Sequence, residues 1–223
     1  MQPHSQPPSQ PRTAPARTRD PFRARAAILA AAVREFAAHG YAGAKLEAIA
    51  SQAEVTKGLV FHHFRSKEAL YVAVMERIYA ELRRRQDETT LAGLGPVEGI
   101  RRLAVDTFRS FRDAPEIVAM MNEENLHRAR HISGSAALPA LYNPLIAEIT
   151  RLLDEGRAVG VFRSGVDPVA FYIALSGLGY FYCSNRHTLG VVFGTDLFEP
   201  RRIETYEALI ADMAVTYLQP DRA

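Results

Sequence analysis

The sequence predicts an all-α protein. Apolar residues recur three or four positions apart through most of its 223 residues, as they do along one face of a helix, and no alternating run of apolar and polar residues indicates a strand. Pro and Gly separate these segments at the positions where helices begin and end. We therefore expect an N-terminal three-helix unit with a helix-turn-helix, followed by a larger helical domain.

The first 21 residues precede the periodic pattern. They contain six prolines, with Ser, Gln and Arg between them, and no apolar stripe. Such a composition cannot bury enough apolar surface to fold. We expect residues 1–21 to be a disordered basic tail.

Residues 22–68 are expected to form the three-helix unit. An Ala-rich apolar stripe predicts a first helix over 22–40, and a shorter stripe predicts a second over 46–53. Thr56 can cap a third helix that ends near Phe64. Two short helices joined by a tight turn and braced by a longer one make a helix-turn-helix, whose second helix enters the major groove of DNA.

Residues 69–223 are expected to form one larger helical domain. Ser66 can cap the helix that leads into it from Lys67. Pro139 and Pro144 are expected to bracket a break in the helical pattern. Further helices are predicted over about 97–112, from Pro115, and over 145–155, 168–186 and 200–218.

The last two of these helices predict a dimer. Helix 168–186 is apolar on nearly all sides, which is typical of an interior or an interface, and Ser176, Gly177 and Gly179 permit close approach of another helix. We expect 168–186 and 200–218 to form a four-helix bundle with their copies in a homodimer. The longest uncharged stretch of the chain runs from Pro168 to Asn185. Polar residues interrupt it, so we expect no membrane span.

The charge is divided unevenly along the chain. The chain holds 27 basic and 25 acidic side chains, a net charge of +2. Residues 1–67 hold ten Lys and Arg against four Asp and Glu, which is +6, so the other 156 residues carry −4. The three lysines, Lys45, Lys57 and Lys67, all lie in the basic part. This asymmetry favours a polyanion-binding end joined to a mildly acidic body.

The single cysteine excludes an internal disulfide and fits a reducing cytoplasm. Cys183 lies in an apolar helix with no cation close before Arg186, which favours a buried, inert thiol over a redox sensor. We expect no cofactor and no resident metal.

Residues 25–74 resemble the TetR family of bacterial transcription regulators. The stretch from Arg25 to Ala32, then Phe36 and His39-Gly40-Tyr41, is similar to the family's first helix. Ile49 to Gly58 is similar to its turn, and Val60 to Leu70 is similar to its recognition helix and the segment directly after it. The chain departs from the family pattern at three places: Ala44-Lys45 replaces a capping hydroxyl, Glu54 replaces Gly in the turn, and Phe61 replaces a Tyr.

The resemblance implies a homodimeric DNA binder, most often a repressor of a nearby catabolic or efflux operon, that a small molecule releases from a near-palindromic operator. Glu54 in a left-handed conformation costs roughly 1 kcal/mol, so we expect the turn to differ in detail. The connection Val159 to Arg163 and Asp167-Pro168 resembles regulators of pyrimidine and nicotinate use, which suggests an aromatic acid or a nucleobase as effector.

The DNA contacts are expected on the second and third helices and just beyond them. Lys67, at a Ser-capped helix start, is the first candidate for a phosphate contact. His62 and His63 cannot share a helix face, so one is expected to reach DNA and the other to be partly packed. Phe61 is a candidate both for DNA contact and for the small core. The expected DNA-binding residues are Lys45, Thr56, Lys57, Gly58, Phe61, His62, His63 and Lys67; the expected core residues are Phe36, Ile49, Val55, Phe61 and Phe64.

A second polar cluster spans residues 120–131. On one continuous helix, Glu123, His127 and His131 would share a face at four-residue spacing, which allows a metal or acid-base trio, a set of surface ion pairs, or part of an effector pocket. The expected pocket residues are Phe108, Met121, Glu124, Asn125, Tyr142, Tyr172, Tyr180 and Asn185.

Three functions stay open at this point. The first is the ligand-responsive repressor. The second is an activator or an effector-free DNA binder of the same fold. The third is a metal-dependent sensor or an enzyme that uses Glu123, His127 and His131; against an enzyme, no nucleophile elbow, phosphate-binding Gly loop or HExxH motif occurs.

Overall fold

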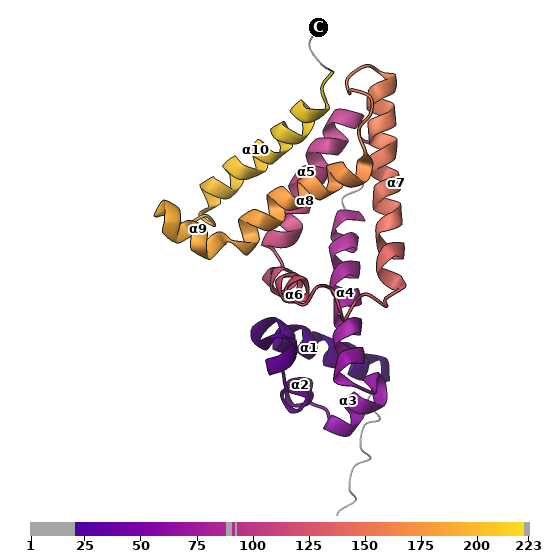
Figure 1. Ribbon diagram of the computed structural model, residues 1–223, viewed down its shortest axis with the longest axis vertical. Coiled ribbons are helices and arrows are strands. Elements are labelled where there is room, and N and C mark those ends of the chain that lie inside the picture. The colour runs from indigo at the N-terminus through magenta and orange to yellow at the C-terminus, as the bar shows by residue number, and fades with distance from the viewer. Residues whose placement is uncertain (1–20, 88–90, 92, 221–223) are drawn as a thin grey trace, which may run out of the picture.

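The computed structural model describes residues 21–87, 91 and 93–220, and within them the chain is helical without strands (Figure 1). In this part of the chain ten helices follow one another: α1 Pro21–Gly43, α2 Leu46–Gln52, α3 Lys57–Phe64, α4 Lys67–Asp87, α5 Pro96–Arg112, α6 Pro115–Leu126, α7 Ala137–Ala158, α8 Pro168–Ser184, α9 Arg186–Phe193 and α10 Pro200–Leu218. The predicted tail over 1–21 lies outside the described residues except for Pro21, which begins α1.

Helices α1, α2 and α3, with the first turns of α4, form the N-terminal unit at one end of the molecule (Figure 1). Ile28, Ala32 and Phe36 are buried along one face of α1, as the apolar stripe predicts. Gly40, at φ 66°, breaks the helical path, so the long helix effectively ends where the sequence places its end.

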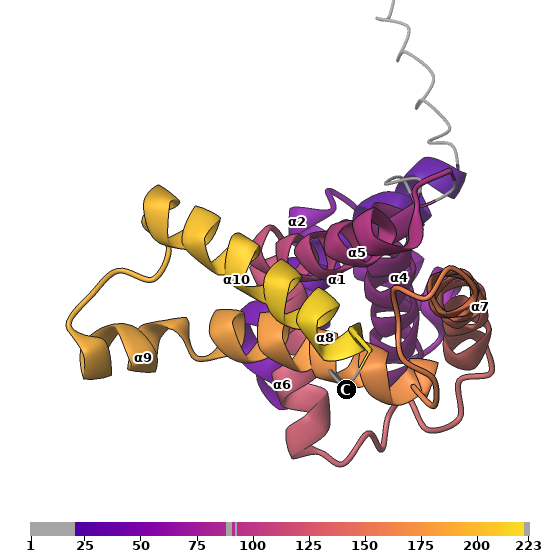
Figure 2. The ribbon, with the colours of Figure 1, turned by 90° about the horizontal axis from the view of Figure 1, so that it is seen from above.

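The rest of α4 and helices α5 to α10 form the body. Helix α5 packs against α8 and α10, and α7 lies against α4, α5 and α8 (Figure 2). One apolar core runs from the N-terminal unit along α4 into α5 and α6, through residues such as Tyr71, Met75 and Phe108. A second core, around Ile100, Ile149 and other aliphatic residues, holds the far end of the body together.

The predicted break at Pro139 and Pro144 is wrong, because α7 runs through both prolines. Pro139 lies in the first helical turn, where the backbone N–H has no partner within the helix. Pro144 lies inside α7 and removes one helical hydrogen bond. Burial of Leu145, Ile149 and Leu152 against the body keeps the helix continuous despite that loss.

Helix α9 is an element that the sequence pattern missed. The sequence predicts no separate helix between 168–186 and 200–218, but Arg186–Phe193 is helical and ends at Gly194 in the left-handed conformation. None of its residues is buried, so it has no apolar stripe facing a core. It extends beyond the other helices at one edge of the body (Figure 2).

Gly177 and Gly179, both expected to permit helix approach, have different neighbours. A Cβ at Gly179 would lie 3.0 Å from the Cα of Phe108, so this glycine permits close packing of α8 on α5 within the chain. Gly177 is exposed with open space around it. No helix among the described residues is both long and apolar enough to cross a membrane.

Candidate DNA-binding surface and effector site

Helix α3 is anchored on one side and open on the other. The Thr56 hydroxyl accepts a hydrogen bond from the Leu59 N–H at 3.2 Å, which is the predicted N-cap. Val60 and Phe64 are buried against the N-terminal unit. The opposite face, including Lys57, is exposed, so α3 presents a polar surface on a fixed backbone.

The turn before α3 keeps the left-handed conformation despite its sequence. Glu54 has a φ of 53°, and the Val55 N–H donates to the Ala50 carbonyl at 2.9 Å. The expected change in the turn is therefore absent at this residue, and the chain accepts the cost of a left-handed Glu instead.

The α2 start is held by a residue that the sequence pattern did not single out. Lys45 stands at the N-cap and its side chain makes no cap hydrogen bond. Instead the buried carboxylate of Glu35 accepts from the Lys45 N–H and from the Gln52 side chain, both at 3.1 Å. The sequence feature that could have identified Glu35 is its position, since it is an acid within the Ala-rich apolar stripe of α1. The Lys45 residue is exposed.

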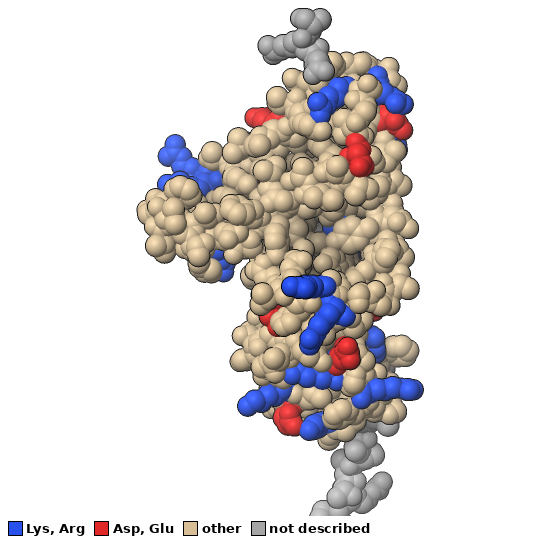
Figure 3. All heavy atoms as spheres, in the orientation of Figure 1, with Lys and Arg blue, Asp and Glu red and all other residues tan. Residues whose placement is uncertain are grey.

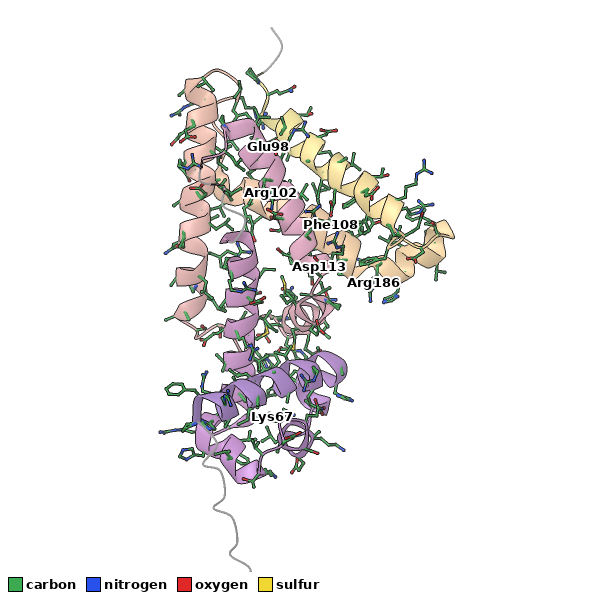
Figure 4. All side chains as sticks on the ribbon, turned by 180° about the vertical axis from the view of Figure 1, so that it is seen from behind. Lys67, Glu98, Arg102, Phe108, Asp113 and Arg186 are labelled. Carbon is green, nitrogen blue, oxygen red and sulfur yellow. The ribbon has the colours of Figure 1, made fainter. Side chains whose placement is uncertain are left out.

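The two lysines at the starts of α3 and α4 have partners within the chain. Lys57 pairs with Glu47 at 2.6 Å on the surface, and this hydrogen bond lowers the pKa of the Glu47 carboxyl. The Lys67 ammonium donates to the carbonyls of Ala44 at 2.6 Å and Ala42 at 3.3 Å. Lys67 therefore also holds together the segment between α1 and α2. In Figure 4 it lies at the opposite end of the molecule from Glu98, near the start of α5.

The aromatic residues of α3 divide into exposed and packed side chains as their spacing predicts, with one exception. His62 is exposed, and His63 is partly buried with its Nε2 shielded and without a hydrogen-bond partner. Phe36, Ile49 and Phe64 are core residues and Val55 is half-buried. The core interpretation of Phe61 is wrong, because 42% of this residue is exposed on the same surface as Lys57.

Basic side chains gather at this end of the molecule. Figure 3 shows most of the visible Lys and Arg around α1 to α4, with fewer acidic side chains between them. Such a surface attracts phosphate groups independently of sequence.

Helix α6 joins the body to the N-terminal unit. Glu123 accepts a hydrogen bond from the Tyr41 N–H at 3.0 Å, directly after the break at Gly40. Gly40 has a φ of 66°, which favours glycine, and a Cβ there would lie 2.8 Å from the Glu123 Oε1, so a side chain would push this carboxylate away. A displacement of α6 would therefore act on the end of α1.

The predicted helical trio of Glu123, His127 and His131 is wrong, because α6 ends at Leu126. Arg128 and Ala129 both have a φ of 57°, which turns the chain away from the helix axis. Among the described residues, no group of three or more His, Cys, Asp or Glu is arranged to hold a metal ion.

His131 instead pairs with Glu124. Its Nδ1 lies 2.8 Å from the Glu124 Oε2, and both side chains are buried. The other oxygen of Glu124 accepts from the backbone N–H groups of His131 and Ile132. Burial favours the protonated carboxyl, but these hydrogen bonds and the charge of His131 outweigh it and hold the pKa of Glu124 below its ordinary value.

The expected pocket residues lie in three places. Phe108, which lies between Arg102 and Asp113 in Figure 4, is fully buried, with Tyr182 and Tyr206 packed on its ring. Asn185 lies at the junction of α8 and α9. Glu124, Met121, Asn125 and Tyr180 belong to the facing helices α6 and α8, where Tyr180 donates to Asn122. Tyr142 and Tyr172 lie on either side of Arg83, a residue that the sequence pattern did not single out.

The thiol of Cys183 is buried, as predicted. Burial raises its pKa to about 12, so the reactive thiolate is not formed near neutral pH.

Comparisons with known proteins match both parts of the chain. Residues 28–74 match the family model of bacterial regulatory proteins of the tetR family, and residues 96–214 match that of tetracyclin repressor-like C-terminal domains. The HTH-type transcriptional repressor NicS of Pseudomonas putida is 31% identical over 197 residues, which cover 88% of this chain and 93% of NicS.

Two further relatives agree with these matches. The HTH-type transcriptional regulator RutR of Escherichia coli K12 is 32% identical over 152 residues, covering 64% of this chain and 65% of RutR. The crystal structure of SCO4942 from Streptomyces coelicolor superposes with a TM-score of 0.66 at 26% identity, over 88% of this chain and 99% of that one. With the helix-turn-helix and most of the body matched, the chain belongs to the TetR family of bacterial transcription regulators.

Proposed function

We propose that this chain is a cytoplasmic, homodimeric repressor that binds a near-palindromic operator through α3 and leaves it when a small molecule binds the body. The observation that carries the proposal is the exposed face of α3 at the basic end of the molecule, fixed by its Thr56 cap and its buried Val60 and Phe64. A helix presented in this way fits the major groove, which is about 12 Å wide.

The proposed contacts divide into positioning and reading groups. Lys45, Lys57 and Lys67 supply charge for phosphates, and Lys57 reaches one by leaving its exposed ion pair with Glu47. Gly58, in the first turn of α3, has no side chain and lets the backbone approach the DNA. The remaining proposed contacts are Thr56, Phe61, His62 and His63.

The proposed dimer uses the apolar surface of α8, α9 and α10. Ile173 and Phe181 on α8 are 64% and 59% exposed in the single chain, and Tyr217 on α10 is 52% exposed. Val191 to Phe193 on α9 extend this surface with three more exposed apolar residues. A soluble protein rarely leaves so much contiguous apolar surface open to water, and a second copy related by a two-fold axis would cover it.

The effector is proposed to act through α6. We place its site in the part of the body where α7 packs on α4 and α8, and α8 packs on α6. The residues proposed around it are Met121, Glu124, Asn125, Tyr142, Tyr172 and Tyr180. A ligand there would shift α6, and the hydrogen bond from Tyr41 to Glu123 would pass that shift to the end of α1. Phe108 and Asn185 are not included, because one is enclosed in the core and the other lies at the far end of α8.

In vitro selection from a pool of random DNA duplexes tests the proposal with the full chain. We expect the selected duplexes to converge on a near-palindrome, with half-sites about one helical turn (~34–36 Å) or a small multiple of it apart. Enrichment of asymmetric sites, or no enrichment over the starting pool, would contradict it.

A further inference from the structure

Arg83, near the middle of the body, is a buried cation without a buried anion. Only 5% of this residue is exposed, and no other Lys or Arg is buried among the residues whose burial the structure describes. Its Nη2 donates to the Tyr172 hydroxyl at 2.6 Å, while Nε and Nη1 are shielded and have no hydrogen-bond partner among the described residues.

The neighbours of Arg83 cannot neutralise it. The guanidinium carbon lies 4.4 Å from the ring centre of Tyr142 and 5.3 Å from that of Tyr172, and Tyr79 packs on Tyr142 at 6.0 Å between ring centres. Burial raises the pKa of Tyr79 and of Tyr142, so both remain neutral phenols. We call Arg83, Tyr79, Tyr142 and Tyr172 the arginine–tyrosine cluster.

Other arginines of the body have the carboxylate partner that Arg83 lacks. Arg101, Arg109, Arg112 and Arg151 each pair with a carboxylate at 2.6–2.8 Å, although all are more exposed than Arg83 and so need a partner less. Glu124, a buried acid of α6, is already paired with His131. A buried charge that lacks a partner is strongly unfavourable, so its retention inside the body calls for an anion from outside the chain.

The geometry points to the chemical class of the effector. We propose that the effector, whose existence rests on the proposed function, is a monocarboxylate with a flat apolar body that binds the arginine–tyrosine cluster. The guanidinium and the phenol hydroxyls donate to the carboxylate, and the tyrosine rings pack on the flat body. A doubly charged phosphate fits less well, because one guanidinium neutralises one charge and the described residues add no second buried cation.

The cluster has a route to solvent. The face of the body in Figure 3 is hollowed between α7 and α8, in front of α4, and a basic side chain is visible at the bottom of the hollow. Tyr79 and Tyr142 are only half-buried. Since Nε and Nη1 are shielded in the unliganded chain, an entering carboxylate displaces part of the Tyr142 ring from the guanidinium.

Thermal unfolding of the full chain tests the proposal at constant ionic strength. The probes are benzoate, phenylacetate and hexanoate, each compared with its uncharged amide. We expect at least one carboxylate to raise the Tm of the wild type by several degrees at millimolar concentration while its amide does not. If no carboxylate stabilises the wild type more than its amide, the proposal is wrong.

Arg83→Met provides the second arm, and it does not depend on the choice of probe. Removing an uncompensated buried charge is expected to raise the Tm of the unliganded protein by roughly 4 °C and to abolish the response to carboxylates. Arg84→Met, which removes the neighbouring exposed guanidinium that pairs with Glu81, should change neither. A lower Tm for Arg83→Met would mean that Arg83 serves the fold alone and would overturn the proposal.

Selection of DNA by the wild type and by Arg83→Met, without any carboxylate, separates this proposal from the proposed function. We expect both proteins to select the same near-palindrome. If neither selects DNA while the carboxylate response holds, the proposed function fails and the anion site stands. If both select DNA and the wild type gives no carboxylate response, the anion site fails and the regulator stands.

Discussion

At the scale of single residues, neighbours in sequence have divided roles on α3. Phe61 is 42% exposed beside Lys57, whereas Phe64, one helical turn later, is 5% exposed in the core of the N-terminal unit. The two rings lie on the same short helix but face in different directions. Substituting each in turn therefore separates an effect on DNA binding from an effect on stability.

We predict opposite effects for Phe61→Ala and Phe64→Ala. Phe61→Ala should leave the free energy of unfolding within about 0.5 kcal/mol of the wild type and weaken DNA binding at least several-fold. Phe64→Ala should cost about 3–5 kcal/mol because it empties a core position. Urea unfolding and DNA-binding titrations measure both effects. Unchanged DNA affinity in Phe61→Ala would remove this ring from the DNA surface.

Glu124 makes stability depend on pH, since its pKa in the folded protein lies below its ordinary value of 4.5. The stabilisation is therefore fully present above that ordinary value and is lost as the pH falls through the lower, folded-state value. Glu124→Gln should cost about 1–3 kcal/mol at pH 7, because the buried His131 loses its charged partner.

The difference in stability between the wild type and Glu124→Gln should shrink as the pH is lowered below 4.5. Denaturant unfolding across the acid range measures it, with the exposed Glu116→Gln as the control on the same helix. A difference that stays constant with pH would contradict the role given to the Glu124 carboxylate.

At the scale of elements, packing decides where local preference is ambiguous. Helix α7 contains a proline that ordinarily kinks or ends a helix, yet its aliphatic face keeps it continuous. Pro144 therefore lowers the stability of the body locally, and a substitution at this position can remove that loss.

We predict that Pro144→Ala stabilises the chain by about 1–3 kcal/mol, because it restores a helical hydrogen bond and relieves the ring's clash with the preceding turn. Pro139→Ala is the matched control and should change little, since Pro139 lies in the first turn of α7. Calorimetric melting compares the three proteins. A Pro144→Ala protein that melts below the wild type would mean that the proline is needed for the shape of α7.

Most helices are predictable from the spacing of apolar residues, and the failures have physical causes. Helix α9 was missed because none of its residues is buried, so it leaves no periodic signal. The trio of Glu123, His127 and His131 failed because two non-glycine residues, Arg128 and Ala129, take left-handed conformations that their residue types do not indicate.

The site was predictable only in part, because some of its residues depend on local spacing and others on packing between helices. Thr56 as a cap and the exposed and packed roles of His62 and His63 follow from local spacing. Arg83 does not, because it stands in a run of three arginines and is singled out only by its contacts with Tyr142 of α7 and Tyr172 of α8. Sequence spacing cannot distinguish a buried arginine from its exposed neighbours.

At the scale of the whole molecule, two helices connect the parts that must communicate. Helix α4 carries Lys67 at its start and Arg83 four turns later, about 24 Å away along the helix. Helix α6 carries Glu123 against the end of α1. A ligand near α4, α6 and α7 would therefore act on the N-terminal unit through both.

The proposed dimer predicts the effect of a charge on its surface. Ile173→Glu should convert the dimer to a monomer and weaken operator binding at least tenfold, because a carboxylate would be buried in an apolar interface. Leu126→Glu, at a 77% exposed position on α6, should preserve the dimer. Light scattering after size-exclusion chromatography gives the mass. An Ile173→Glu protein that remains dimeric would place the interface elsewhere.

The central claim is that the exposed face of α3 binds a specific DNA sequence. Anisotropy titrations of the selected near-palindrome and of a scrambled duplex, repeated over a range of salt concentrations, test it most directly. We predict binding to the selected duplex about 10³-fold or more tighter than to the scrambled one. Lys57→Ala should lower the salt slope by about one unit, and Arg157→Ala at the far end of α7 should not change it. Equal affinity for both duplexes, with a salt slope indifferent to Lys57, would contradict the account.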